Sequence, residues 1–240
     1  MGSAEQNTFD WWLERLGKIT ASEIGVLMVE PRSKTEEFTK TQTAYIDKKA
    51  CDLIYKRFVE REKLQLIYEE EQAKFNNIPD VVRGKEHEPY ARMAFECLAG
   101  VEVEQRGFMV DPKRTYFGAS PDGVVTIKNR NYNIEIKCPR LENHLRNVQW
   151  RTTDYEVLKP DYKWQMVAQA HLCDINESIF ISFCAEAPES LQLCTRVFTW
   201  TTKEFEQMLN KIDYFSGIIE HRFQQIQNMD DETLGLTGWR

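Results

Sequence analysis

The chain has 240 residues, of which 42% are hydrophobic and 29% charged, so its composition is that of an ordinary globular protein with room for one domain or two small ones. It contains no run of about 18 apolar residues and no basic segment followed by an apolar one at its start, which argues against a membrane span and a secretory signal. The net charge of −7 argues against a protein that simply coats DNA, because such binding comes from neutralised phosphates.

The six cysteines include no Cys-x-x-Cys pair and only four histidines are present, which argues against zinc and iron–sulfur sites. This usage of cysteine indicates a reducing, cytoplasmic setting. No low-complexity tract, Gly/Ser linker or internal repeat divides the chain. We therefore expect a single domain over residues 1–240, with a core at about 80–200 and helices added on both sides.

The first part of the chain is predicted to be helical. Residues 5–16 repeat aromatic and leucine side chains at helical spacing. Thr20-Ala-Ser-Glu23 has the form of a capping box, so a second helix is expected to begin there. Ser22 would lie in its first turn, where backbone N–H groups favour anions. A long helical stretch rich in Lys and Glu is expected at 36–75.

A further helix is predicted at 85–99, with an apolar stripe that includes Ala91 and Phe95. Glu88 falls on this stripe, near the start of the predicted helix. An acidic residue in a first turn can simply complement the helix dipole. It can also approach a metal site if the rest of the chain supplies one.

The second half of the chain is predicted to supply a sheet and two helices. Strand-like runs occur at 101–110, 116–127, 132–138, 178–184 and 192–200. Helical spacing occurs at 163–173 and 201–226. The predicted fold class is α/β: a central mixed β-sheet flanked by helices, with extra N- and C-terminal helices.

Two of these runs are expected to form a hairpin that carries two carboxylates. The Asn-rich turn Asn129-Arg130-Asn131 separates them. Residues two apart in a strand point to the same face, so Glu135 and Lys137 project together, and Asp122 in the neighbouring run can lie beside Glu135. Paired carboxylates suit Mg²⁺, and a lysine beside them can hold an attacking water or stabilise charge in phosphodiester hydrolysis.

Each half of this pattern also has an ordinary explanation. Ser-Pro-Asp-Gly at 120–123 is a common β-turn, and Glu-x-Lys is a common solvated pair on a strand. Joined on one hairpin, with twelve residues between Asp122 and Glu135, they resemble the Asp…Glu-x-Lys signature of the PD-(D/E)XK nuclease superfamily.

Five motifs narrow the resemblance to one family. They are Trp11-Trp-Leu-Glu-Arg15-Leu-Gly-Lys-Ile-Thr20-Ala-Ser22-Glu, Arg83-Gly84 with Glu88, Ser120-Pro-Asp122-Gly, Glu135-Ile-Lys137-Cys-Pro139 and Tyr162-Lys-Trp-Gln165. In order and spacing, over positions 9 to 173, they resemble the phage lambda exonuclease family, the viral recombination exonucleases.

The resemblance implies a metal-dependent catalytic site. The ligands of two Mg²⁺ ions, or of Mn²⁺ in their place, would be Asp122, Glu135, the backbone carbonyl of Ile136 and Glu88. Lys137 would position or deprotonate the attacking water, and Gln165 would orient a water or a phosphate oxygen. For Gln165, a helix-surface amide bonded to solvent is the alternative.

The resemblance also implies a pocket for the 5′-phosphate of a DNA strand, formed by Arg15, Ser22 and Ser120. A guanidinium, hydroxyl groups and a helix N-terminus are suitable partners for such an anion. Trp11 would stack on a base or pack within the protein. Where the family tends to place a further basic residue, Asn143 stands here, with Arg140 and Arg146 three residues to either side. Which of these two arginines completes the pocket is left open.

The function that the resemblance implies is a Mg²⁺-dependent 5′→3′ exonuclease acting on linear double-stranded DNA. It would release mononucleotides and leave a 3′ single-stranded tail for recombination by a single-strand annealing protein. A ring-shaped homo-oligomer, a trimer, is implied as well. Two alternatives are a structure- or site-specific endonuclease, which would not need the Arg15 and Ser22 motif, and a non-catalytic DNA-end-binding subunit, which would not need Asp122, Glu135 and Lys137.

Overall fold

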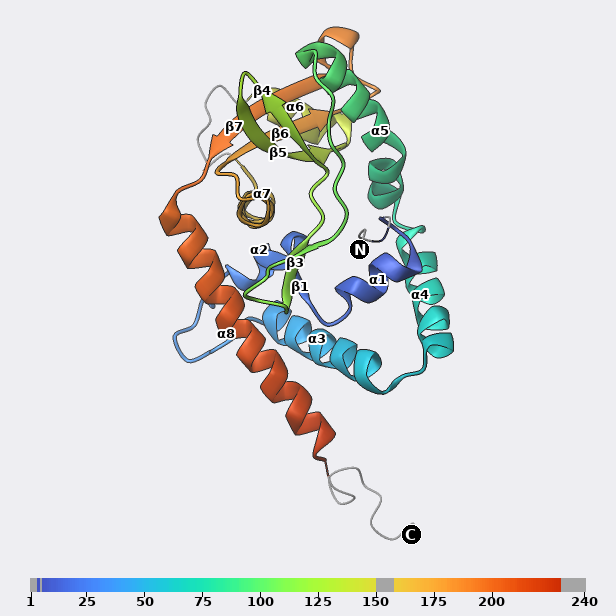
Figure 1. The fold of residues 1–240 in the computed structure, drawn as a ribbon, viewed down its shortest axis with the longest axis vertical. Helices are drawn as coiled ribbons and strands as arrows, with labels where there is room; N and C mark the ends of the chain where they lie inside the picture. The colour runs from blue at the N-terminus through green and yellow to red at the C-terminus, as the bar shows by residue number, and fades with distance from the viewer. Residues whose placement is uncertain (1–3, 5, 150–157, 230–240) are drawn as a thin grey trace.

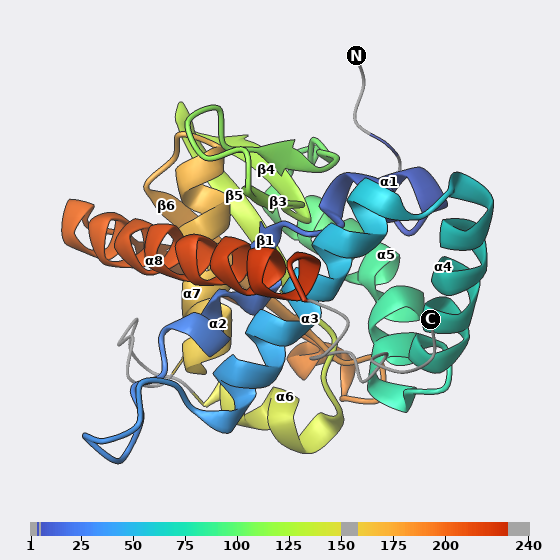
Figure 2. The ribbon, with the colours of Figure 1, turned by 90° about the horizontal axis from the view of Figure 1, so that it is seen from below.

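The computed structural model describes residues 4, 6–149 and 158–229, which form a four-stranded and a three-stranded sheet with helices around them (Figures 1 and 2). The larger sheet has the order β4 (Gly123–Ile127), β5 (Arg130–Lys137), β6 (Glu177–Phe183) and β7 (Leu193–Thr199). β5 and β6 are parallel and the two outer pairs are antiparallel, so the sheet is mixed. The predicted fold class is confirmed.

The β4–β5 hairpin closes through a two-residue turn, one position earlier than predicted. Lys128 and Asn129 have φ angles of 49° and 64°, and Ile127 pairs with Arg130. Two successive positive φ angles are the signature of a type I′ turn, whose twist matches that of antiparallel strands. The resulting register pairs Gly123 with Ile134, which brings the residue before β4 level with the residue after Ile134.

The smaller sheet has the order β1 (Ile19–Thr20), β3 (Phe117–Ala119) and β2 (Met109–Val110). The single strand expected at 116–127 is therefore wrong: β3 and β4 belong to different sheets. Pro121, which has no N–H to donate, lies in the short segment that separates them, where the chain bends at Asp122. Of the strand expected at 101–110, only β2 and an isolated bridge from Glu104 to Val124 are present.

The helices largely follow the predicted spacing. Their bounds are α1 Phe9–Arg15, α2 Ile24–Leu27, α3 Lys40–Phe58, α4 Arg61–Phe75, α5 Pro79–Ala99, α6 Leu141–Val148, α7 Pro160–Leu172 and α8 Thr202–Gln227, with short 3₁₀ turns η1 at Ala21–Glu23 and η2 at Glu189–Leu191. The capping box at Thr20 and Glu23 is present, and it opens η1, which continues into α2. The stretch at 36–75 is two helices, because the chain is extended at Val59 and Glu60.

The helix predicted at 85–99 begins earlier, at Pro79. Proline is favoured at the first helical position, where a missing N–H costs nothing. Glu88 therefore lies in the third turn of α5, and the interpretation that it complements the helix dipole in a first turn is wrong. The helix predicted at 163–173 likewise begins at Pro160.

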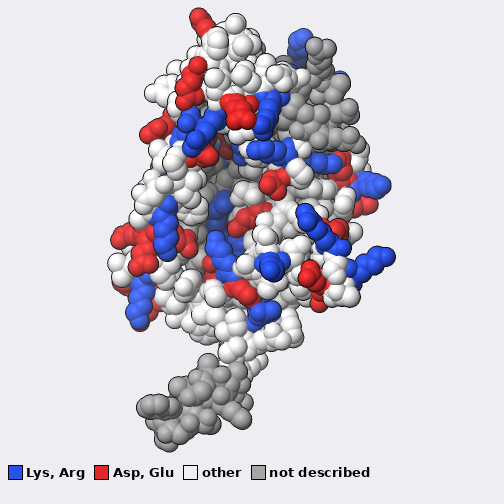
Figure 3. Space-filling model, turned by 180° about the vertical axis from the view of Figure 1, so that it is seen from behind, with Lys and Arg blue, Asp and Glu red and all other residues white. Residues whose placement is uncertain are grey.

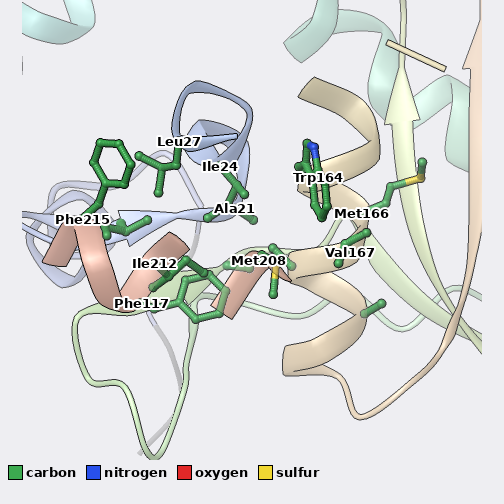
Figure 4. Packing of buried hydrophobic residues seen from close by; sticks show 14 of the residues in the cluster. Ala21, Ile24, Leu27, Phe117, Trp164, Met166, Val167, Met208, Ile212 and Phe215 are labelled. Atoms are coloured by element: carbon green, nitrogen blue, oxygen red, sulfur yellow. The ribbon is translucent and has the colours of Figure 1, made fainter. Parts of the chain in front are cut away.

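The two faces of the larger sheet are covered by different helices. On one face, Ile134 and Ile136 of β5 pack with Ala91 and Phe95 of α5. On the other face, Phe180 of β6 packs with α7, and α7 continues the core toward α2 and α8. Figure 4 shows this second part of the core, where side chains from α2, β3, α7 and α8 meet. Among the described residues, none of the helices has both the length and the apolar character needed to cross a membrane.

Candidate functional site

A cavity of about 370 Å³ lies beside the end of the β4–β5 hairpin. Its lining residues are Asp80, Gly84, Glu88, Asp122, Glu135, Ile136, Lys137, Cys138, Pro139, Arg140, Asn143, Lys159, Tyr162 and Gln165. All the residues that the sequence predicts as catalytic are among them. They come from α5, the segment before β4, strand β5 and α7, so four separate parts of the chain meet at one place.

The β4–β5 hairpin determines where the carboxylates of Asp122 and Glu135 lie relative to each other. The backbone N–H of Ile136 donates to Asp122 Oδ2 at 2.7 Å, which holds the Asp122 side chain against β5. Glu135 is completely buried and points to the opposite face of β5 from Ile136, toward α7. The predicted convergence of the two carboxylates is therefore present in the fold.

Each carboxylate oxygen of Glu135 has one polar partner. Its Oε1 forms an ion pair with the ammonium of Lys137, and its Oε2 accepts a hydrogen bond from Gln169 Nε2 at 2.7 Å. Lys137 in turn donates to Gln165 Oε1 at 3.2 Å and lies 5.0 Å from the ring centroid of Tyr162. Gln165 is thus part of the lysine's surroundings and is not a surface amide bonded only to solvent.

The electrostatics of the cavity show a surplus of negative charge. Burial, together with the charges of Glu135 and Glu88, raises the pKa of Asp122 well above its usual value. Burial also raises the pKa of Glu88, and the charge of Glu135 adds to this effect despite the ion pair with Arg92 at 2.5 Å. For Lys137, burial acts to lower the pKa, but the charges of Glu135 and Asp122 outweigh it and raise the pKa.

These residues fit a divalent cation in their chemistry. Four carboxylates line the cavity, those of Asp80, Glu88, Asp122 and Glu135, and burial disfavours the charged form of two of them, Asp122 and Glu88. In the described parts of the chain, no three His, Cys, Asp or Glu side chains are already grouped as metal ligands. Each carboxylate is instead turned toward its own partner: Ile136, Lys137, Arg92 or Arg140.

A second cavity, of about 410 Å³, contains part of the predicted phosphate pocket. Trp11, Arg15 and Ser22 line it, together with Lys48, Lys49 and Lys85 among others. The guanidinium of Arg15 lies 4.1 Å from the ring centroid of Trp11 and donates to Thr20 Oγ1 at 3.4 Å. Burial lowers the pKa of Arg15, an effect that the charge of Glu23 opposes, and no carboxylate in the described ranges lies within ion-pair distance of it.

Ser120 lines neither of these two cavities but lies between residues that do. Its Oγ accepts a hydrogen bond from Trp11 Nε1 at 3.0 Å, and Asp122 follows two residues later. Trp12, by contrast, donates to Glu71 at 2.9 Å and packs on Phe9 and Tyr68, so it has a structural role between α1 and α4. The structure thus brings Arg15, Ser120 and Trp11 together.

The two candidate arginines after the hairpin differ in position. Arg140 lines the cavity with the carboxylates and donates to Asp80 at 2.8 Å. Arg146 lies on the exposed side of α6, where it pairs with Glu142 at 2.6 Å, and it lines neither cavity. Figure 3 shows one face of the molecule with a hollow that has both basic and acidic side chains at its rim.

Several residues of the site are missing from the sequence-based prediction. Gln169 contacts Glu135 directly, and its one available signal was its position one helical turn after Gln165. Arg92 pairs with Glu88 four residues away, a spacing that is readable in a sequence once the helix is assigned. The adjacent basic pair Lys48 and Lys49 on α3 reaches the Arg15 cavity only through the tertiary fold.

The fold is similar to that of known nucleases. An alkaline exonuclease (LHK-Exo) from Laribacter hongkongensis matches with a TM-score of 0.72 and 23% identity over 92% of this chain and 96% of that one. The same enzyme in complex with dAMP gives a TM-score of 0.71 and 24% identity over the same shares. A phage-related exonuclease from Haemophilus somnus 129PT gives 0.64 and 14% over 89% and 96%. A comparison with curated protein sequences gives no match.

At the level of sequence, residues 10–176 match the family described as the YqaJ-like viral recombinase domain. The matched stretch begins next to Trp11 and extends past Gln165, so it contains all five motifs and both cavities' principal residues. The likeness to the lambda exonuclease family and its PD-(D/E)XK core is confirmed by this match and by the shared fold. The chain belongs to the family of YqaJ-like viral recombinase domains.

Proposed function

We propose that the protein is a metal-dependent exonuclease that degrades one strand of linear double-stranded DNA from its 5′ end. The observation that carries this proposal is the convergence of the carboxylates of Glu88, Asp122 and Glu135 on one cavity with Lys137 and Gln165. The alkaline and phage-related exonucleases with the same fold support the class of reaction, and the dAMP complex of one of them supports a nucleotide as product.

The proposed cofactor is Mg²⁺, replaceable by Mn²⁺, with two ions held by Asp122, Glu135, Glu88 and the backbone carbonyl of Ile136. When bound, the metal supplies positive charge that offsets the charge developing on the phosphate and the leaving oxygen. The raised pKa values of Asp122 and Glu88 support a cation at this place. Burial is the largest cause of both shifts and the charge of Glu135 adds to it, and a bound cation would offset both effects by stabilising the ionised carboxylates.

Lys137 and Gln165 are proposed to act on the water and the phosphate. The raised pKa of Lys137 keeps its side chain in the ammonium form, which can donate hydrogen bonds to an attacking water or to a phosphate oxygen. Gln165 Oε1 accepts from this ammonium and limits the directions in which it can point. Positioning of the water is therefore favoured over removal of its proton by this lysine.

Arg15, Ser22 and Ser120 are proposed to bind the 5′-phosphate, with Trp11 beside them. The guanidinium of Arg15 has no carboxylate partner in the described ranges, so its charge is available to an anion. Arg140 is favoured over Arg146 as the further basic residue, because Arg140 lines the cavity and Arg146 is turned toward Glu142. Reading a terminal phosphate would give the enzyme its direction along the strand.

The remaining proposals concern products and assembly. We propose that mononucleotides are released, that the 3′ tail is passed to a single-strand annealing protein, and that the chain acts as a homotrimeric ring in the cytoplasm of a bacterial or phage-infected cell. A ring retains DNA by enclosing it, which suits a chain with a net charge of −7 because little non-specific attraction is then needed.

The test is digestion of a linear duplex labelled at either 5′ end, with Mg²⁺ and with EDTA, beside a closed circular duplex of the same sequence. We expect the linear DNA to lose its labels as mononucleotides only with Mg²⁺, and the circle to survive. Cutting of the circle would identify an endonuclease. Binding of ends without digestion under any metal would identify a non-catalytic subunit, and either result would overturn the proposal.

A further inference from the structure

A chain of hydrogen bonds runs through buried polar side chains between α7 and the larger sheet, and it ends at Glu135. Trp200 Nε1 donates to Ser178 Oγ at 2.6 Å, and Ser178 Oγ donates to Asn133 Oδ1 at 2.5 Å. Asn133 Nδ2 donates to Gln169 Oε1 at 3.2 Å, and Gln169 Nε2 donates to Glu135 Oε2 at 2.7 Å. Trp200 is 2% exposed and the other four residues are completely buried.

The two ends of this chain of bonds determine its direction. The indole N–H of Trp200 can only donate, and the ionised carboxylate of Glu135 can only accept. Between them, the hydroxyl of Ser178 must give its proton to Asn133, and both amides are fixed in one of their two orientations. Gln169 therefore presents its NH₂ group to Glu135, and the opposite orientation would place two oxygen atoms against each other.

We infer that Gln169 is a positioning residue for Glu135, and that Asn133, Ser178 and Trp200 hold Gln169 in the orientation that this requires. Gln169 secures Oε2 of Glu135, so Oε1 is the oxygen directed to Lys137 and the cavity. The inference rests on the proposed function, in which Glu135 is a metal ligand.

The packing around Gln169 supports a specific role. Its neighbours on α7, namely Met166, Val167, Ala168 and Ala170, are all apolar and completely buried. A polar side chain in such surroundings costs free energy unless each of its groups is bonded, and an apolar residue would pack there without that requirement. Loss of a partner that orients a metal ligand in this way commonly lowers metal affinity or activity by about 10- to 100-fold.

The first experiment replaces Gln169 by a side chain of similar length that cannot donate. In Gln169→Met, Glu135 Oε2 loses its donor and the carboxylate is free to turn. We expect the Mn²⁺ concentration at half-saturation, measured by calorimetric titration of the DNA-free protein, to rise by about 10- to 100-fold. The half-saturating Mg²⁺ concentration for digestion should rise in parallel. Gln192→Met is the matched control, because the Gln192 side chain donates to the Ala185 carbonyl in an exposed loop, and it should change neither value.

The second experiment reverses the direction of the bonds without changing the shape of a side chain. In Asn133→Asp, the new carboxylate cannot donate to Gln169 Oε1, so the Gln169 amide turns its NH₂ group toward residue 133 and its oxygen toward Glu135. We expect the same loss of Mn²⁺ affinity although Gln169 is intact. Asn131→Asp is the control, since Asn131 accepts from Thr126 on the exposed hairpin end.

The outcomes are distinguishable. If Gln169→Met and Asn133→Asp lower the melting temperature in EDTA but bind Mn²⁺ as the unmodified protein does, the bonds have only a structural role and the inference is overturned. If Asn133→Asp alone keeps full affinity, the direction of the bonds does not matter and the inference is again wrong. Failure of the proposed function gives another pattern, because the unmodified protein then neither binds Mn²⁺ nor digests DNA.

Discussion

Trp11 donates a hydrogen bond from its indole to Ser120 Oγ at 3.0 Å, which ties the first helix to a residue two positions before Asp122. The same indole ring carries the guanidinium of Arg15 on its face, 4.1 Å from the ring centroid. The cavity that contains Arg15 and the cavity that contains Asp122 are thus joined through one short segment of chain. Changes on either side are expected to affect different steps of one reaction.

Asp122→Asn is expected to abolish digestion without lowering the stability of the metal-free protein. Burial and the charges of Glu135 and Glu88 raise the pKa of Asp122, so its ionised form is unfavourable in the folded state at neutral pH. An asparagine oxygen can still accept from the Ile136 N–H. Thermal melts in EDTA at pH 8 test the expected stability, and a digestion assay tests the expected loss of activity.

The same substitution at Asp213 is the control for Asp122→Asn. Asp213 accepts from Arg114 at 2.7 Å and from Tyr116 at 2.7 Å, and these bonds lower its pKa. Asp213→Asn should therefore lower the melting temperature and leave digestion intact. Substantial digestion by Asp122→Asn would contradict its assignment as a metal ligand.

Lys137→Met is expected to affect both stability and rate. It leaves the buried carboxylate of Glu135 without its ion-pair partner, which costs about 3–5 kcal/mol in a fully buried site and less here because Lys137 is 25% exposed. Digestion should slow by about 10²–10⁴-fold at saturating Mg²⁺. Since a bound cation would take over part of the lost charge, Mg²⁺ should raise the melting temperature of this variant more than that of the unmodified protein. Equal shifts in both proteins would count against the carboxylates as its ligands.

Arg15→Ala is expected to reduce a preference for 5′-phosphorylated ends. The unmodified protein should degrade a linear duplex with a 5′-phosphate faster than the same duplex with a 5′-hydroxyl. Loss of a charge-assisted contact worth about 1.5–3 kcal/mol corresponds to about 10- to 100-fold, and the loss should fall mainly on the phosphorylated substrate. Initial rates on the two substrates measure it. Equal rates for the unmodified enzyme would rule out the phosphate pocket.

The surroundings of Asp111 predict an acid-dependent change in stability, away from the cavity that contains Asp122. Its carboxylate accepts from His171 Nε2 at 2.8 Å and from the N–H groups of Lys113 and Arg114 at 2.8 and 2.9 Å. Burial acts to raise its pKa, but these bonds outweigh it and the pKa is lowered. A lowered pKa contributes stability that is complete above the unfolded value of about 4 and is lost as the pH falls through the folded value.

Asp111→Asn should therefore be less stable than the unmodified protein by about 1–3 kcal/mol at pH 7. The difference should shrink as the pH falls below about 4, because both proteins then lack the carboxylate charge. Urea unfolding at pH 7 and pH 3 measures it. A difference that stays constant between the two pH values would show that the charge of Asp111 is not the cause.

The proposed ring predicts a defined mass in solution. Light scattering in moderate salt should give three times the mass of the chain, and digestion of a long duplex should continue when excess competitor DNA is added after binding. A chain that stays monomeric at assay concentration and still digests processively would refute enclosure as the means of retention.

The carboxylates of the site could be predicted from the sequence because their placement depends on local rules. Alternation along β5 and a short hairpin are enough to bring Asp122, Glu135 and Lys137 together. The helix α8 and strands β6 and β7 were predictable for the same reason, to within a residue or two at each end.

The parts that the sequence could not supply depend on packing between distant segments. Gln169 contacts Glu135 because α7 packs on one face of the larger sheet, which no spacing in the sequence expresses. The assignment of β3 and β4 to different sheets depends on which partners each finds, namely β1 and β2 for β3, and β5 for β4. The break at Val59 separates two stretches that both favour helix, so periodicity alone did not reveal it.

The position of Pro121 has a consequence for the length of the fragments that such an enzyme releases. It is the one residue between Ser120 and Asp122, and two steps of extended chain cover at most about 7 Å, the scale of a single nucleotide. If Ser120 holds the 5′ end of the strand and Asp122 binds at the phosphodiester that is cut, the short peptide between them fixes the released fragment at one nucleotide. A glycine inserted after Pro121 should then increase the distance between Ser120 and Asp122 and lengthen the released fragments. A gel distinguishes longer fragments from a mere loss of rate.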